Sequence, residues 1–88
     1  MVWTVSFNHY ASRQIRRLNK TAQLRILKYL NRTLEGIDDP HLYGKSLRGK
    51  PEGRWRYRTG DYRIICRLDH TGKKIVVLDA GHRGAVYR

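Results

Sequence analysis

The fold of this chain is decided by the stretch Arg54-Trp-Arg-Tyr-Arg-Thr-Gly-Asp-Tyr-Arg-Ile-Ile-Cys-Arg-Leu68. Two runs rich in arginine, aromatic and β-branched residues, 54–58 and 62–68, flank the spacer Thr59-Gly60-Asp61. This spacer has the glycine and aspartate chemistry of a hairpin turn. A third run, 74–80, follows a second glycine-containing spacer, 69–73. The sequence therefore predicts three consecutive strands joined by hairpins.

Side chains alternate between the two faces of a strand, so this stretch separates into an apolar set and a basic set. The basic set is Arg54, Arg56, Arg58, Arg63 and Arg67. An exposed antiparallel face commonly shows polar residues, but here no acid on the two strands offsets the repulsion between like charges. Guanidinium groups also suit bidentate recognition of phosphate. The pattern therefore indicates one uncovered sheet face that binds a polyanion such as RNA.

Alternation over residues 2–7 predicts an N-terminal strand that buries Trp3, Val5 and Phe7. Asn8 is the expected N-cap of a first helix. The inner face of this helix would carry Ala11, Ile15 and Leu18.

A second helix is predicted after the break at Asn19-Lys20, with Thr21 as its N-cap and Gly36 as its C-cap. Its apolar stripe would be Leu24, Ile26, Leu27, Leu30 and Leu34. Residues 37–52 hold both prolines and no clear period, which predicts a loop with a candidate edge strand at Ser46-Leu47-Arg48. The expected fold is α+β, β-α-α-β-β-β, with a helical hairpin on one face of a small, mainly antiparallel four-stranded sheet.

The composition points to one small domain, residues 1–88, with an anionic partner. The formal net charge is +12, and twelve of the nineteen bases lie in residues 41–88 with four of the seven acids. No run approaches the ~20 apolar residues of a membrane-spanning helix, and no signal-peptide pattern follows Met1. The single Cys66 suits the core of a protein in a reducing cytoplasm. Cys66 and the four histidines lack ligand spacing, so no metal or cofactor is expected.

The C-terminal segment adds further candidate functional residues. A last strand would deliver His82 and Arg83 at its end, and Gly84 would let the chain turn so that Tyr87 lies near the arginine face. Taken alone, a terminal tyrosine is more often a packing residue, and a lone histidine is more often an ordinary surface residue.

In order and spacing these pieces resemble RelE-type toxins of the RelE/ParE superfamily, which are partnered by acidic antitoxins. The resemblance covers nearly the whole chain. It is carried by the helical hairpin, Leu47-Arg48-Gly49, Trp55-Arg56-Tyr57-Arg58, Gly60-Asp61-Tyr62-Arg63 and Gly81-His82-Arg83 through Tyr87. It implies a metal-independent endoribonuclease that enters the ribosomal A site and cleaves mRNA there. In such enzymes the RNA's own 2′-OH attacks the adjacent phosphorus and leaves a 2′,3′-cyclic phosphate and a 5′-OH.

The resemblance also implies roles for individual residues. The family's basic pair falls on Arg54 and Arg56, its third-strand arginine on Arg63, and its C-terminal arginine and tyrosine on Arg83 and Tyr87. Arg63 and Arg83 can bind phosphoryl oxygens in the transition state, and Tyr87 can stack on a base or orient the 2′-OH. The family's basic pair is often lysine. Because arginine stays protonated, Arg54 and Arg56 are expected to stabilise charge rather than to act as a base.

Proton transfer is assigned by hypothesis to His82, since histidine changes its charge near neutral pH. The remaining candidate RNA- or ribosome-binding residues are Lys45, Arg48, Lys50, Arg58, Arg67 and Arg88.

The resemblance implies as partners a cognate acidic, RelB-like antitoxin in a hetero-oligomer, and the ribosome with its A-site rRNA and mRNA, with no membrane. An antitoxin could dock on the helix surface around Leu24, Leu27 and Tyr29, unless this surface is core. A fold of this kind does not fix the function. ParE-type members inhibit DNA gyrase and need no nuclease chemistry, and an inactive or purely RNA-binding domain is a third possibility.

Overall fold

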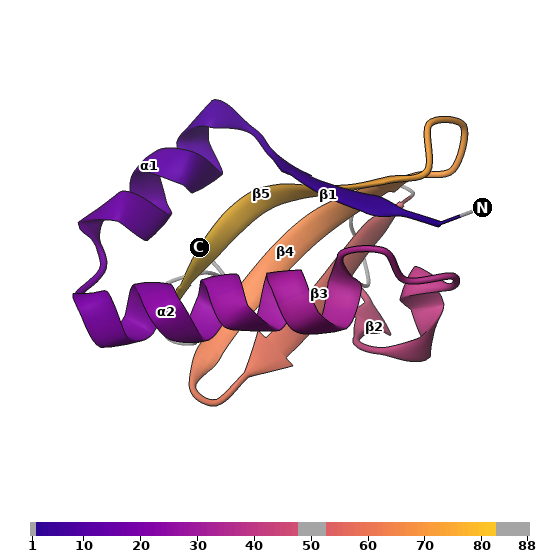
Figure 1. Cartoon of the computed structure of the whole chain (residues 1–88). Coiled ribbons are helices and arrows are strands. Elements are labelled where there is room, and N and C mark those ends of the chain that lie inside the picture. The colour runs from indigo at the N-terminus through magenta and orange to yellow at the C-terminus, as the bar shows by residue number, and fades with distance from the viewer. Residues whose placement is uncertain (1, 48–52, 83–88) are drawn as a thin grey trace.

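A five-stranded mixed sheet carries two helices on one of its faces (Figure 1). The computed structural model describes residues 2–47 and 53–82. The elements are β1 Thr4–Phe7, α1 His9–Arg17, α2 Lys20–Tyr29, β2 Lys45–Ser46, β3 Arg54–Thr59, β4 Tyr62–Asp69 and β5 Lys74–His82. A π-helical turn, Leu30–Leu34, continues α2, and a short 3-10 turn spans Pro40–Leu42. No helix in the described ranges is long and apolar enough to cross a membrane.

The strand order is β1-β5-β4-β3-β2. β1 runs parallel to β5, and every other neighbouring pair is antiparallel. The three predicted C-terminal strands and the hairpin turns between them are confirmed. The candidate edge segment forms β2 one residue earlier than expected, with Lys45 opposite Arg56 and Ser46 opposite Trp55. The Leu47 N–H donates a further hydrogen bond to the Arg54 carbonyl at 3.2 Å. This short strand is the fifth member of a sheet expected to have four.

The helix caps were partly predictable. Asn8 caps α1 as expected, because its side chain accepts a hydrogen bond from the Ala11 backbone N–H at 2.8 Å. Thr21 as the second cap is wrong: Asn19 accepts from the Ala22 N–H at 2.8 Å, and α2 begins two residues earlier than predicted. Both residue types can cap a helix, so the choice depends on which side of the helix is buried.

The buried side of α2 follows an interval of four residues: Ala22, Ile26, Leu30 and Leu34. Leu24 and Leu27, placed in the apolar stripe by the sequence, are instead 56% and 41% exposed. Phe7 is also exposed rather than buried, and it lines a surface groove together with these two leucines. The interpretation of Leu24 and Leu27 as core is therefore wrong.

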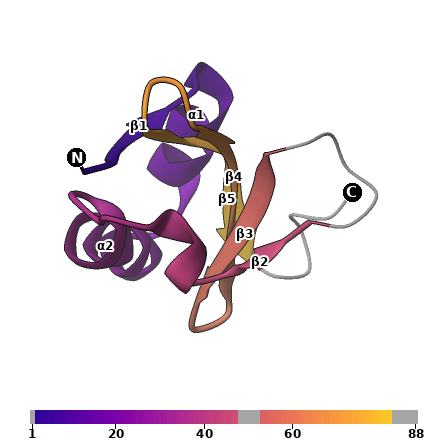
Figure 2. The same ribbon diagram turned by 90° about the vertical axis from the view of Figure 1, so that its right-hand side faces the viewer.

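The hydrophobic core lies between the helices and the sheet face that carries Tyr57, Ile64 and Val77. Cys66 belongs to this core and is fully buried, as predicted. Burial raises the pKa of its thiol, so the group stays protonated and acts as a small apolar side chain. Figure 2 shows both helices on this side of the sheet, so no helix of the described residues covers the opposite face.

Candidate functional site

The arginines of β3 and β4 share one sheet face, opposite the face that carries the core residues. Both helices lie on the core side of the sheet (Figure 2). We call the arginine-bearing surface the basic face and define it by Arg54, Arg56, Arg58, Arg63 and Arg67. Arg54 stands directly opposite Arg67, and Arg58 stands directly opposite Arg63. Like charges in such cross-strand pairs destabilise a sheet by roughly 0.2–1 kcal/mol. A bound polyanion would remove this repulsion.

One acid also lies on the basic face. Asp79 of β5 pairs with Ile65 of β4, two residues from the pair between Gly81 and Arg63. Since residues two apart on a strand share a face, Asp79 points to the same side as Arg63. Its Oδ1 atom is buried and has no hydrogen-bond partner within the described ranges. Strict alternation counted from the buried Ile75 and Val77 would place Asp79 on the core face. The register shift between Ile65 and Cys66 turns Asp79 to the basic face instead, and this irregularity has no signal in the sequence.

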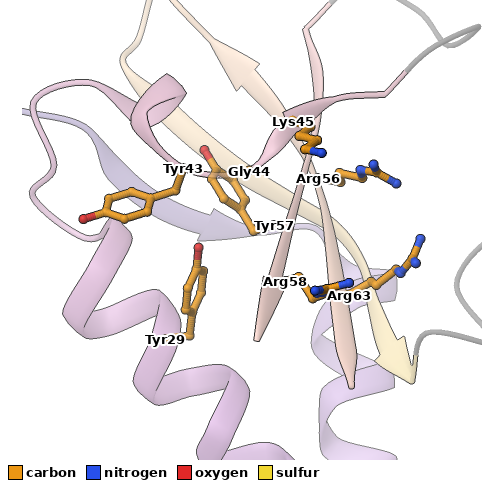
Figure 3. Close-up of a pocket in the computed structure, with 8 residues that line it drawn as sticks. All are labelled: Tyr29, Tyr43, Gly44, Lys45, Arg56, Tyr57, Arg58 and Arg63. Atoms are coloured by element: carbon orange, nitrogen blue, oxygen red, sulfur yellow. The ribbon is translucent and has the colours of Figure 1, made fainter. Parts of the chain in front are cut away.

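A hollow of about 410 Å³ opens where the basic face meets the outer edge of β3 (Figure 3). Its cationic side is formed by Lys45 of β2 together with Arg56, Arg58 and Arg63. Its other lining residues are Tyr29, Tyr43, Gly44 and Tyr57. Figure 3 shows the tyrosines gathered on one side of the hollow and the cationic side chains on the other. The structure thus brings together four predicted site residues and three tyrosines. Tyr43 and Tyr57 were not expected at a site, and Tyr29 was expected only on the antitoxin-docking surface.

The loop that carries Tyr43 is fixed to the sheet by two side chains of β3. The indole Nε1 of Trp55 donates a hydrogen bond to the Tyr43 carbonyl at 2.7 Å. The Tyr57 hydroxyl, which is buried, donates to the Pro40 carbonyl at 2.8 Å. Both contacts join positions more than ten residues apart in the chain. They hold the wall of the hollow in place before any ligand binds.

The phenols of Tyr29 and Tyr57 stay neutral at physiological pH. Burial, with smaller contributions from Cys66 and Tyr43, raises the pKa of Tyr29 to about 12. Burial also raises the pKa of Tyr57, with smaller contributions from Cys66, Tyr29 and Asp39. A protonated phenol can donate a hydrogen bond or stack through its ring, but it cannot accept a proton as a base. The tyrosines therefore suit binding rather than proton abstraction.

The other predicted site residues do not all reach this hollow. Arg54 and Arg67 lie at the far end of the β3–β4 hairpin and do not line it. His82 is exposed at the end of β5, with its ring edge-on to Tyr62 at 5.8 Å between centroids. Because His82 pairs with Tyr62, alternation turns its ring to the face opposite Arg63. Five predicted residues lie outside the described part of the chain: Arg48, Lys50, Arg83, Tyr87 and Arg88.

The arrangement suits electrostatic chemistry on a phosphate. Three guanidinium groups and one ammonium group face a shared space, and charge-assisted hydrogen bonds of this kind are about twice as strong as neutral ones. Within residues 2–47 and 53–82, no group of three or more His, Cys, Asp or Glu side chains is placed to hold a metal ion.

Comparison with known proteins identifies the relatives of this chain. The family described as "ParE toxin of type II toxin-antitoxin system, parDE" matches residues 5–87. Toxin RelG of Mycobacterium tuberculosis is 30% identical over 88 residues, which cover 100% of this chain and 99% of RelG. Toxin RelE of the same organism is 29% identical over 84 residues, which cover 96% of this chain and 84% of RelE.

A solved structure supports the same relationship. The crystal structure of the toxin–antitoxin complex RelBE2 from Mycobacterium tuberculosis contains a chain that superposes with a TM-score of 0.82 at 28% sequence identity. The match covers 94% of the present chain and 100% of that one. The chain therefore belongs to the RelE/ParE superfamily, the toxins of type II toxin–antitoxin systems.

Proposed function

We propose that this toxin is a metal-independent endoribonuclease that cleaves mRNA in the ribosomal A site and so inhibits translation. The observation that carries the proposal is the convergence of Lys45, Arg56, Arg58 and Arg63 on one hollow of the uncovered basic face. An RNA backbone is the polyanion that such a face would bind. The names of the relatives, toxins RelE and RelG, favour the same class of activity.

The proposed reaction is an internal phosphoryl transfer within the RNA. The 2′-oxygen attacks the adjacent phosphorus, the bond from phosphorus to the 5′-oxygen breaks, and the products are a 2′,3′-cyclic phosphate and a 5′-OH. One proton leaves the 2′-OH and one is added to the departing 5′-oxygen. Negative charge accumulates on the phosphoryl oxygens, where Arg63 and Arg56 would stabilise it. Arg83 and Tyr87, outside the described residues, complete the proposed active site, and Arg54 assists from the far end of β3.

His82 is the candidate for proton transfer. We expect His82→Gln to lower the single-turnover cleavage rate and to flatten its dependence on pH between about 5 and 8, where histidine titrates. The matched control is His9→Gln, because His9 is an exposed histidine at the start of α1. The measurement is the cleavage rate on programmed ribosomes across this pH range. A wild-type rate and pH profile in His82→Gln would remove His82 from the mechanism.

We also propose that an acidic antitoxin silences this toxin, in the cytoplasm where its target lies. The related RelBE2 structure is described as a toxin–antitoxin complex, and a net charge of +12 favours an acidic partner. The groove along α2 and β1 is lined by exposed Phe7, Leu24 and Leu27. Because these apolar side chains face solvent, this groove is the expected docking surface for an apolar antitoxin segment in the hetero-oligomer.

The test of the function is to express the toxin briefly in bacterial cells and map new 5′ ends on messages. We expect cuts within translated codons that are lost in messages lacking a start codon. The alternative function is gyrase inhibition, which the name ParE of the matching family favours. Intact messages together with loss of supercoiling by purified gyrase would contradict the nuclease and support that alternative. Cuts that persist without translation would remove the ribosome from the mechanism.

A further inference from the structure

The hollow has an aromatic side that the proposed cleavage reaction does not use. Tyr43 is 48% exposed, so its ring is open to a ligand. Tyr29, at the end of α2, lies beside it and is half-buried. Tyr57 is fully buried, and its hydroxyl is occupied by Pro40. Tyr43 is therefore the ring of this set that an incoming flat molecule can cover.

The same part of the hollow has an open strand edge. The pairing of β2 with β3 ends at Lys45 and Arg56 and does not extend to Arg58, because the chain turns away at Gly44, which has a φ of +71°. The two-residue turn at Gly60-Asp61 makes Thr59 and Tyr62 the hydrogen-bonded closing pair of the β3–β4 hairpin. The next pair, Arg58 and Arg63, is then of the non-hydrogen-bonded kind. The main-chain N–H and C=O of Arg58 consequently point away from β4, toward the hollow.

The main-chain N–H donor and C=O acceptor of Arg58 lie side by side. They match the edge of a nucleobase, which also presents hydrogen-bond donors and acceptors side by side. The exposed ring of Tyr43 can stack on the face of the base, and the cations on the other side of the hollow can bind its phosphate. Interleaved aromatic and cationic groups are the usual means of holding single-stranded RNA. The volume of about 410 Å³ falls within the range of ~300–1,000 Å³ typical of small-ligand sites.

We propose that this hollow is a nucleotide subsite, in which one base of single-stranded RNA stacks on Tyr43 and pairs with the main-chain edge of Arg58. Lys45 and Arg56 hold the phosphate of the same nucleotide. The subsite deepens the proposed nuclease function, on which it rests, because it places a nucleotide beside Arg63 and so selects which base lies next to the cleaved bond. The wall is preformed by the Trp55 and Tyr57 hydrogen bonds, so binding needs no ordering of the loop.

The test measures binding of the purified toxin to a labelled RNA trinucleotide by fluorescence anisotropy, with no ribosome present. We expect Tyr43→Leu to weaken binding about tenfold, which is the size of one base–aromatic stack. Tyr43→Phe keeps the ring and should bind as the wild type does. The matched control is Tyr10→Leu, because Tyr10 is 59% exposed on α1 and does not line the hollow.

A second ligand separates stacking from a change in the fold. Three trinucleotides are compared, each lacking the base at a different position. The wild type and Tyr43→Leu should bind with equal affinity to the one that lacks the base stacked on Tyr43. If Tyr43→Leu instead weakens every abasic ligand as much as the intact trinucleotide, Tyr43 acts on the structure and the subsite is overturned. Unchanged binding of the intact trinucleotide would overturn it as well.

The strand edge could instead pair with an extended protein segment. In that case Tyr43→Leu would weaken binding of an acidic antitoxin peptide and leave trinucleotide binding unchanged, which would also overturn the subsite. Trinucleotide binding is independent of cleavage. If the toxin binds RNA through Tyr43 but cuts no message, the subsite proposal stands and the nuclease proposal is overturned. If the toxin cuts messages but Tyr43 is not needed for trinucleotide binding, the nuclease proposal stands and the subsite is overturned.

Discussion

Replacing Arg63 with alanine should lower the rate of ribosome-dependent mRNA cleavage by roughly 100- to 1,000-fold, as expected for the loss of one preorganised charge-stabilising donor. Arg63 lies on the central strand β4, and its partner on β5 is Gly81, so no opposing side chain on that strand covers it. It is half-buried and lines the hollow with Arg56. A guanidinium held in this way is already oriented when charge develops on the phosphate.

The matched control is Arg67→Ala. Arg67 lies on the same strand and the same face, but it is exposed and does not line the hollow. Exposed phosphate contacts act mainly on binding and its salt dependence, so this variant should cleave within a few-fold of the wild-type rate at saturating ribosome concentration. The measurement is single-turnover cleavage on programmed ribosomes. Equal losses in the two variants would show that the basic face acts only as a diffuse binding surface, without a specific role for Arg63.

The second large effect is expected from Gly44→Ala, which should lower the free energy of unfolding by about 3 kcal/mol or more. Gly44 has a φ of +71°, and a left-handed conformation costs alanine about 1–2 kcal/mol. A Cβ atom here would also collide with the Arg56 carbonyl oxygen and lie 2.8 Å from Tyr57 Cδ1. Relief of these contacts requires moving β2 away from β3, with loss of the strand pairing and of the Trp55 hydrogen bond.

Gly36→Ala provides the control for the backbone contribution. Gly36 has a φ of +81°, but nothing lies within 4 Å of a Cβ atom built there. It should therefore show only the conformational cost of about 1–2 kcal/mol. Urea denaturation of the wild type and both variants, followed by circular dichroism, measures the difference. Equal destabilisation by the two substitutions would mean that the close approach of Gly44 to β3 contributes nothing to stability.

Much of the sheet could be predicted because its signals are local. Turn residues between two strand patterns predict a hairpin, although the predicted spacer Thr59-Gly60-Asp61 is one residue too long, because Thr59 pairs with Tyr62. Alternation along those strands then places five arginines on one face and the core residues on the other. Asn8 was predictable as a cap for the same reason, since a cap is recognised by the residues directly beside it.

Other features depend on contacts between distant parts of the chain. Asn19 and Thr21 are both acceptable caps locally, whereas the burial of Ala22 and Ile26 on one side of α2 depends on the rest of the fold. The parallel pairing of β1 with β5 joins residues 70 positions apart, such as Thr4 and Lys74, and has no local signal.

The aromatic side of the hollow could not be predicted either. Tyr29 and Tyr43 come from a helix and a loop, and they line the same hollow as the arginines only in the folded chain. The roles assigned to Arg83 and Tyr87 remain predictions from the sequence.

The position of β5 has a consequence for the synthesis of this toxin. The strand is one of the last described segments to leave the ribosome, yet it lies inside the sheet, between β1 and β4. A nascent chain that ends before residue 74 therefore has no partner for β1 and lacks the core residues Ile75 and Val77. A nascent chain emerges from its N-terminus, so α1 and α2 are synthesised before the sheet on which they pack is complete. Folded toxin therefore forms only after residues 74–82 have been made.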